Sequence, residues 1–309
     1  MKQEHISVLK DEVIEYLNIK EDGIYVDATL GYAGDSKEIL KRNKKGFLFA
    51  FDKDIDAINK SKEYIKEFNN YKIFNTGFIN IKETLENEGI SKVDGILFDL
   101  GVSSPEIDEA KRGFSYMVDS KLDMRMNQSA KFSAYDVVNS YSKEELTRIF
   151  REYGEEKHAN KIANKIVEAR SIKEINTTLE LVDIIDKCIP YREKRNSHPA
   201  KKVFQAIRIE VNNELGEFEK ALEDSLKMLN VGGRVVVITF HSLEDRICKQ
   251  IFKKYTTIDP FYKGLPNVDE SLLPDFKLLT NKPIIPTERE QEYNKRSRSA
   301  KLRAIEKIK

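Results

Sequence analysis

The chain has 309 residues, of which 40% are hydrophobic and 34% charged, and its formal net charge is +1. This length suits about two domains of a soluble globular protein. No apolar run approaches the ~20 residues of a membrane helix, and the first residues lack the apolar stretch of a secretory signal. We therefore expect a cytoplasmic protein with no membrane partner. Because the charge is balanced, any affinity for nucleic acid must come from a local patch.

Metal ligation is not expected from the sequence. The two cysteines, Cys188 and Cys248, form no C-x-x-C pair. The four histidines are scattered without the spacing of metal ligands. We predict neither a structural nor a catalytic metal site.

The first third of the chain alternates between short apolar runs and helical patterns. Strands are predicted at 24–28, 47–51, 71–74 and 93–98, and helices at 36–42, 55–68 and 79–87. Such alternation implies right-handed crossovers, and hence an α/β fold with a mostly parallel sheet and helices on both faces.

The middle of the chain changes character. Between about 108 and 195 there is no second series of buried strands, but capping-box patterns begin helices at Ser142 and Thr177. These features predict an inserted helical domain at 108–205, within a domain formed by 1–107 and 206–309. Extra helices layered on a single domain remain the alternative.

The α/β pattern then resumes towards the C-terminus. It predicts a helix at 214–229 that ends before Gly232 and Gly233, and a strongly apolar strand at 234–240. A further helix follows at 243–255, with Ser242 as its N-cap.

Acidic residues and glycines follow the predicted strands. Ligands of open α/β sheets bind at the carboxyl ends of strands, where this chain has Asp27, Asp52 and Asp99. Gly31 and Gly34 let the backbone approach a ligand at a helix N-terminus. Their G-x-x-G spacing differs from the dinucleotide fingerprint and favours a nucleoside without phosphates, such as S-adenosylmethionine.

Each of these residues also has a purely structural interpretation. Asp27 and Asp52 could cap helices or end strands, although at its spacing Asp52 suits ribose hydroxyls. Phe78, which follows the third strand, could cover an adenine or pack in the core.

Several longer sequence motifs resemble those of a known protein family. They are DGILFDLGVSSP (94–105), RGFS (112–115), LDMRM (122–126), HPAK (198–201), FQAIR (204–208), TFHSLEDR (239–246) and SRSAKLR (297–303). With these strings the chain resembles the bacterial 16S rRNA cytosine-N4 methyltransferases, the RsmH (MraW) family. The resemblance implies a Rossmann-like class I methyltransferase domain carrying an inserted helical domain.

The resemblance also implies a reaction and its participants. S-adenosylmethionine would be the donor, and the exocyclic N4 amine of a cytidine in the decoding region of 16S rRNA, on the small ribosomal subunit, the acceptor. A homodimer stays open, since the sequence does not fix the oligomeric state. The implied cofactor-binding positions are Ala33, Gly34, Asp35, Asp52, Phe78, Asp99 and Glu106.

Two of these positions depart from the family pattern. The family generally has His where this chain has Asp35 and Gln where it has Glu106. Both changes add negative charge near a ligand that carries a sulfonium and an ammonium. We expect them to favour the cationic donor over the product, whose sulfur is neutral.

Five residues are candidates for the chemistry: Asp99, Ser103, Ser104, Phe240 and His241. Asp99 could hold the cofactor or accept an N–H of the target amine, and the serines could orient the base or only form a turn. Phe240 could receive a base extruded from its stack, or pack in the core. His241 could contact RNA or bond a neighbouring carbonyl.

The helix predicted after Pro199 is the candidate RNA surface. Its polar stripe consists of Lys201, Gln205, Arg208 and Asn212, and Arg112, Phe114 and Arg125 are further candidates. On this interpretation Arg208→Ala should weaken rRNA binding and flatten its salt dependence. A solvated face is the alternative.

Three rival functions remain open. A nicotinamide-dependent oxidoreductase shares the sheet, although the G-x-x-G spacing speaks against it. The others are an RNA-binding factor without turnover and a methyltransferase for protein or small molecules.

Overall fold

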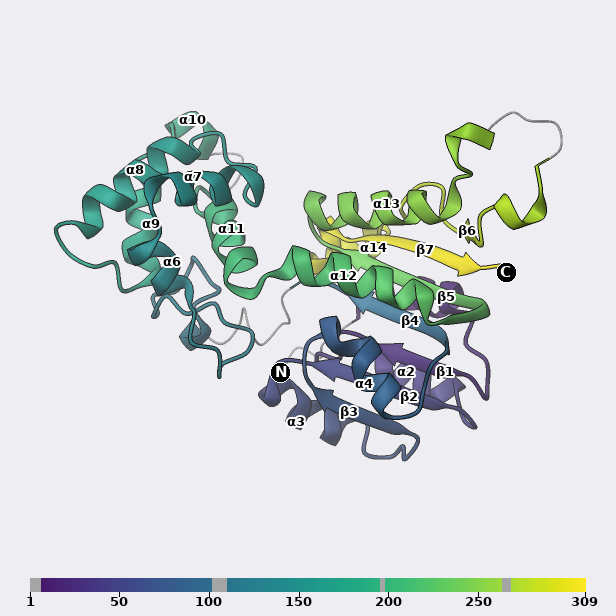
Figure 1. Ribbon diagram of the computed structural model, residues 1–309. Helices are drawn as coiled ribbons and strands as arrows, with labels where there is room; N and C mark the ends of the chain where they lie inside the picture. The colour runs from purple at the N-terminus through teal and green to yellow at the C-terminus, as the bar shows by residue number, and fades with distance from the viewer. Residues whose placement is uncertain (1–6, 102–109, 195–197, 263–267) are drawn as a thin grey trace. The chain divides into compact units, whose positions relative to one another are not determined.

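The computed structural model of the protein describes residues 7–101, 110–194, 198–262 and 268–309. The chain divides into two compact units. The first, here called the sheet unit, comprises residues 1–101 and 215–309, and the second, the helical unit, comprises residues 102–214 (Figure 1).

The sheet unit is built on seven strands in the order β3-β2-β1-β4-β5-β7-β6. The first five in this order are mutually parallel, whereas β7 is antiparallel to β5 and β6, so the expected mostly parallel sheet is confirmed. The strands are β1 (Ile24–Asp27), β2 (Phe47–Asp52), β3 (Tyr71–Asn75), β4 (Val93–Asp99), β5 (Leu229–Thr239), β6 (Phe276–Leu278) and β7 (Lys301–Lys307).

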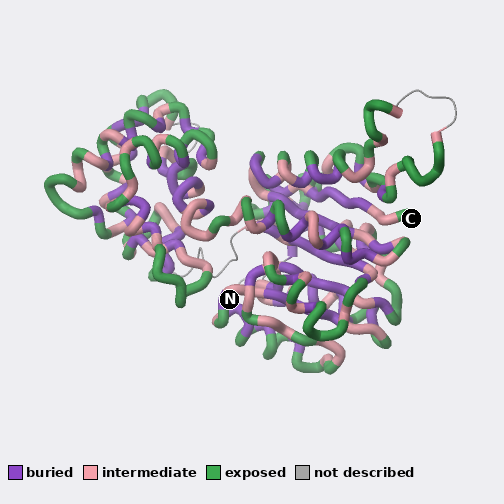
Figure 2. The backbone as a smooth tube through the Cα atoms, in the orientation of Figure 1, coloured by how far each residue is buried: buried purple, intermediate pink, exposed green. Residues whose placement is uncertain are grey.

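Helices cover both faces of this sheet, as expected. Side chains alternate between the faces along a strand, so Phe98 and Val237 join one apolar core while Leu97 and Val236 join the other. The first core includes α4 (Ile81–Asn87), α12 (Glu214–Lys227) and α13 (Ser242–Thr256). The second includes α1 (Lys10–Leu17), α2 (Gly34–Arg42) and α3 (Ile55–Tyr64). Figure 2 shows the buried strands between helices with exposed outer sides.

Two predicted boundaries around β5 were wrong. Gly232 and Gly233 do not follow the helix end but lie within β5, where the pairing with β4 shifts register between Val93 and Gly95. Gly232 has φ +80°, a conformation that suits an irregular strand position and not a regular one.

The helical unit has a core of its own. Capping boxes at Ser142 and Thr177 begin two of its helices, as the sequence predicted. The unit extends to Glu214, beyond the expected end at 205, because α11 (Lys201–Asn212) packs Val203, Phe204 and Ile207 into this core. Its helices are α6 (Ala134–Ser140), α7 (Lys143–Glu152), α8 (Ala159–Arg170), α9 (Thr178–Asp186), α10 (Tyr191–Lys194) and α11 (Lys201–Asn212).

Short helices complete the described chain: η1 (Phe78–Asn80), η2 (Ala110–Arg112), η3 (Pro260–Tyr262), η4 (Glu270–Leu272), α14 (Glu288–Tyr293) and η5 (Lys295–Ser299). Over the four described ranges, no helix is both long enough and apolar enough to span a bilayer.

Candidate functional site

Four carboxyl groups gather at the carboxyl edge of the central strands. Asp27 and Asp99 end β1 and β4, while Asp35 and Glu244 lie in the first turns of α2 and α13. Burial raises the pKa of Asp99 well above its usual range, and the charges of Asp35, Asp27 and Glu244 raise it further. Burial, followed by the charge of Asp27, likewise raises the pKa of Asp35 to about 7. Like charges act this way only at short range, so these groups form one acidic cluster.

Asp27 is satisfied within the protein. Its two oxygens accept hydrogen bonds from Ser36 Oγ (2.6 Å) and from the backbone N–H of Thr29 (3.1 Å). Thr29 Oγ1 in turn accepts from the backbone N–H of Asp99 (2.7 Å). Asp27 therefore fixes the turn after β1, and Thr29 links that turn to the end of β4.

Asp35 and Asp99 are not fully satisfied. Asp35 Oδ1 and Asp99 Oδ1 are both buried, and neither has a hydrogen-bond partner in the part of the chain that is described. Buried oxygens without a donor are costly, and a cationic ligand would satisfy both. The ammonium and sulfonium of S-adenosylmethionine fit this requirement. Across the same residues no group of His, Cys, Asp and Glu is arranged to hold a metal ion.

The backbone between β1 and α2 adopts a turn that a ligand can approach closely. Gly31 and Ala33 both have left-handed backbones, with φ +50° and +61°, which is uncommon for alanine and indicates a constrained turn. Ala33 is the N-cap of α2 and offers no side-chain acceptor. The first N–H groups of α2, which begins at Gly34, therefore receive no side-chain cap at this edge of the sheet, and free N–H groups at a helix N-terminus suit a polar or anionic ligand group.

Asp52 and Phe78 lie at the ends of the next elements. Asp52 accepts from the backbone N–H groups of Gly31 (2.9 Å) and Asp54 (2.8 Å), so it ties the turn after β1 to the end of β2. Phe78 is partly buried, with its ring 5.8 Å from that of Phe98 in an edge-to-face arrangement. One side of the Phe78 ring packs in the core. The other side is partly exposed and can contact a ligand.

The turn after β5 brings an aromatic ring to the end of β4. Gly101 has φ +105°, and a Cβ there would lie 3.1 Å from Cδ2 of Phe240. Glu244 fixes this turn because its Oε2 accepts from the backbone N–H groups of Phe240 (2.8 Å) and His241 (3.2 Å). The ring of Phe240 therefore packs directly on the backbone beside Asp99.

The prediction that Ser242 caps α13 was wrong. His241 is the N-cap, and its Nδ1 accepts from the backbone N–H of Glu244 (3.4 Å). Its Nε2 lies 3.1 Å from Glu244 Oε1, so the imidazole contacts its own helix. Sequence reasoning missed Glu244 because histidine stands where a capping box normally has Ser or Thr. Three further candidates, Ser103, Ser104 and Glu106, lie outside the described residues.

Three predicted RNA-binding residues hold the helical unit together. Arg112 is only 4% exposed and donates to the carbonyls of Arg125 (3.0 Å) and Met126 (3.2 Å). Its guanidinium lies 5.8 Å from the ring of Phe114, itself buried. Arg125 forms an ion pair with Asp123 at 2.7 Å. These contacts favour structural roles for all three residues.

The polar stripe of α11 also faces the protein over most of its length. Gln205 donates to the carbonyl of Tyr153 (2.9 Å). Asn212 accepts from the backbone N–H of Met126 and donates to the carbonyl of Met124, both at 2.8 Å. Arg208 binds both carboxylate oxygens of Glu214 at 2.8 Å. Of the four residues in the stripe, Lys201 is the exposed one.

Arg208→Ala is therefore expected to destabilise the protein, by about 1–3 kcal/mol, because it leaves a mostly buried carboxylate without its partner. Thermal unfolding measures this loss, and the exposed Lys201→Ala is the matched control with no expected change. Weaker rRNA binding by Arg208→Ala at an unchanged melting temperature would instead support the RNA-surface interpretation.

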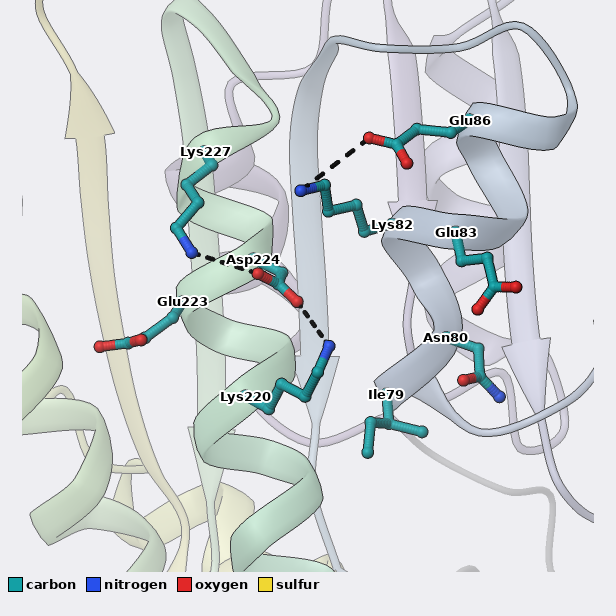
Figure 3. Close-up of a pocket in the computed structure, with 9 residues that line it drawn as sticks. All are labelled: Ile79, Asn80, Lys82, Glu83, Glu86, Lys220, Glu223, Asp224 and Lys227. Carbon is teal, nitrogen blue, oxygen red and sulfur yellow. Dashed lines mark hydrogen bonds and ion pairs between the residues drawn. The ribbon is translucent and has the colours of Figure 1, made fainter.

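A surface groove elsewhere in the sheet unit is not a comparable site. It lies between α4 and α12 and contains none of the strand-end carboxyls (Figure 3). Asp224 pairs there with Lys220 (2.7 Å) and Lys227 (3.3 Å). Its charges are thus largely neutralised by one another, and nothing in it selects a ligand.

Comparison with known proteins supports the family resemblance that the sequence motifs indicate. Residues 2–308 match the MraW methylase family. The chain is 55% identical over 309 residues, 100% of both chains, to "Ribosomal RNA small subunit methyltransferase H" of Clostridium botulinum (strain Loch Maree / Type A3). It is 53% identical over 311 residues, again 100% of both, to the protein of that name from Clostridioides difficile (strain 630). The resemblance is confirmed: the chain belongs to the MraW methylase family.

Proposed function

We propose that this protein transfers a methyl group from S-adenosylmethionine to the exocyclic N4 amine of a cytidine in the decoding region of 16S rRNA, on the small ribosomal subunit. The observation that carries the proposal is the acidic cluster, in which two buried carboxylate oxygens lack a donor at the edge where sheet ligands bind. Relatives named as small-subunit rRNA methyltransferases supply the substrate class. When bound, S-adenosylmethionine supplies a methyl carbon activated by its positively charged sulfur.

We assign different residues of the sheet unit to different parts of this ligand. Asp35 and Asp99 offer negative charge to its cationic end, and Asp52, at the end of β2, is the expected acceptor for the ribose hydroxyls. The left-handed turn at Gly31 and Ala33 lets backbone N–H groups of α2 approach the ligand. Phe78 supplies an aromatic surface for the adenine.

The acceptor amine is a weak nucleophile because its lone pair is delocalised into the cytosine ring. A group that accepts an N–H of the amine localises that lone pair and directs it at the methyl carbon. We assign this role to Asp99, at the end of β4, and the orientation of the base to Ser103 and Ser104, which follow it in sequence. Most of the rate enhancement then comes from alignment, together with stabilisation of positive charge developing on nitrogen.

A cytosine in folded RNA must leave its stack before it can react. The ring of Phe240, packed on Gly101 beside Asp99, offers an aromatic face for the extruded base. His241 supports this arrangement by capping α13 and so holding the turn that carries Phe240.

Labelled S-adenosylmethionine, incubated with the protein and small subunits that lack the modification, tests the proposal. Nucleoside mass spectrometry of the digested rRNA should find the label in N4-methylcytidine, and subunits already carrying the modification should accept none. Protein-free 16S rRNA in a parallel reaction tests whether the assembled subunit is required. Label in another nucleoside, or in no RNA fraction, would refute the proposal.

The setting of the protein follows from this substrate. We place it in the cytoplasm, where small subunits of bacterial ribosomes are assembled. A homodimer is the oligomeric state to test, and sedimentation equilibrium across a concentration series distinguishes it from a monomer.

A further inference from the structure

The C-terminal segment 295–303 carries five cationic side chains, and the structure separates them into two groups. Two of them lie in β7 and bind Asp245 of α13: Arg303 Nε is 2.7 Å from Oδ1, and Lys301 Nζ is 3.4 Å from Oδ2. These ion pairs hold the pKa of Asp245 below its usual range. Arg303 and Lys301 therefore serve to attach β7 to α13.

The other three cations, Lys295, Arg296 and Arg298, belong to η5 and are exposed. The turn itself is anchored, because Ser297 is fully buried and its Oγ donates to the carbonyl of Asn294 (2.8 Å). Among the described residues, no carboxylate lies within ion-pair distance of Lys295 or Arg298. An anchored turn thus presents cations outward.

The strand pairing shows at which edge of the sheet the cations of η5 lie. Lys301, the first residue of β7, pairs with Thr239, the last residue of β5, and Phe240 follows directly. The neighbouring strand β4 pairs Asp99 with Ile238 of β5. The turn therefore leaves the sheet at the edge that carries the acidic cluster and the ring of Phe240.

The surroundings of η5 favour a nucleic acid over other anions. Tyr293, which ends α14, is 53% exposed close in sequence to these cations, and aromatic rings beside cations are typical of surfaces that bind single strands. Of the three glutamates in α14, Glu288 and Glu292 are exposed, whereas Glu290 is buried and accepts from the backbone N–H of Leu9 (2.9 Å), so it is not part of the surface beside η5.

We propose that η5 binds backbone phosphates of the rRNA strand next to the target nucleotide, through Lys295 and Arg298, with Tyr293 as a stacking surface for a neighbouring base. This inference rests on the proposed function and names the part of the sheet unit that holds the substrate strand. A protein with a net charge of +1 has no overall field to attract RNA, so a local group of this kind is required.

The test compares the double variant Lys295→Gln/Arg298→Gln with the wild type in binding unmodified small subunits over a range of KCl concentrations. Each phosphate contact to a single strand contributes about 0.7 to the slope of log K against log[salt]. The variant should thus have a slope lower by about 1.4 and bind about 10- to 30-fold more weakly at ~0.1 M salt. Tyr293→Ala should weaken binding without changing the slope.

Two controls separate this proposal from the proposed function. The variant Lys62→Gln/Lys66→Gln removes two exposed lysines, one in the last turn of α3 and one just after this helix, and should behave as wild type. Titration with S-adenosylmethionine should give the same affinity for all variants, which verifies that they fold. If the Lys295→Gln/Arg298→Gln variant binds subunits with the affinity and salt slope of the wild type, the role of η5 is refuted and the proposed function is not. If the wild type itself binds no subunits, the proposed function is refuted as well.

Discussion

Replacement of Asp99 with asparagine is expected to weaken S-adenosylmethionine binding by about 10- to 100-fold. The variant keeps the size of the side chain and removes the negative charge that the buried, unsatisfied Oδ1 offers to a cationic ligand. Interactions with charged groups contribute about 1.5–3 kcal/mol, and about 1.4 kcal/mol corresponds to a factor of ten in Kd. Isothermal titration calorimetry measures the effect directly.

The same variant distinguishes the two roles open to Asp99. If Asp99 only holds the donor, saturating S-adenosylmethionine should restore kcat; if it also accepts an N–H of the amine, kcat should stay low at saturation. Asp54→Asn is the matched control, because Asp54 is a buried carboxyl at the same sheet edge that caps α3, a role that asparagine also fills. An unchanged Kd in Asp99→Asn would remove Asp99 from the ligand site.

The sheet and its carboxyl edge were predictable from the sequence because their signals are local. Strands buried on both faces, such as Val93–Asp99, appear as continuous apolar runs, and the first polar residue after each run marks the carboxyl edge. That is why Asp27, Asp52 and Asp99 were found as a set. The connectivity rules for parallel strands then bring these ends together.

The environment of the polar side chains was not predictable, because their partners are distant in sequence. Gln205 and Asn212 occupy a regular polar stripe, yet they bond backbone groups of loops at Tyr153 and Met124. A helical periodicity shows which side chains share a face, and not whether water or a loop covers that face. Glu244 was missed for a related reason, since the acidic cluster it joins is assembled from separate turns.

The affinity for S-adenosylmethionine is expected to rise with pH through about 7, because the pKa of Asp35 in the free protein is raised to about 7 and that of Asp99 is raised well above its usual range. Below this pH the ligand must displace a proton to meet a charged carboxylate, which reduces affinity by at most tenfold per pH unit for each proton displaced. Groups that act on Asp35 are Asp27 and Glu38, which raise its pKa, and Ser7 and Lys10, which lower it. Calorimetry in buffers of different ionisation enthalpy measures the proton released.

The stability of the free protein should change with pH in the opposite direction. The native state holds the proton of Asp35 more tightly than the unfolded chain, whose carboxyl has a pKa of 3.8. The corresponding stability is full below about pH 4 and is lost as pH rises through about 7. Asp35→Asn should therefore melt a few degrees higher than wild type at pH 8 while binding S-adenosylmethionine more weakly and with less pH dependence.

Asp35→His, which introduces the residue usual in the family, tests whether this charge selects the donor. S-adenosylhomocysteine shares the ammonium of the donor and lacks the positive sulfur, so a carboxylate facing the sulfur should favour the donor and one facing the ammonium should favour neither. We expect Asp35→His to lower the ratio of donor to product affinity, and an equal loss for both ligands would assign Asp35 to the ammonium instead. Because a merely structural carboxyl would alter stability without altering this ratio, the two measurements together separate ligand recognition from fold maintenance.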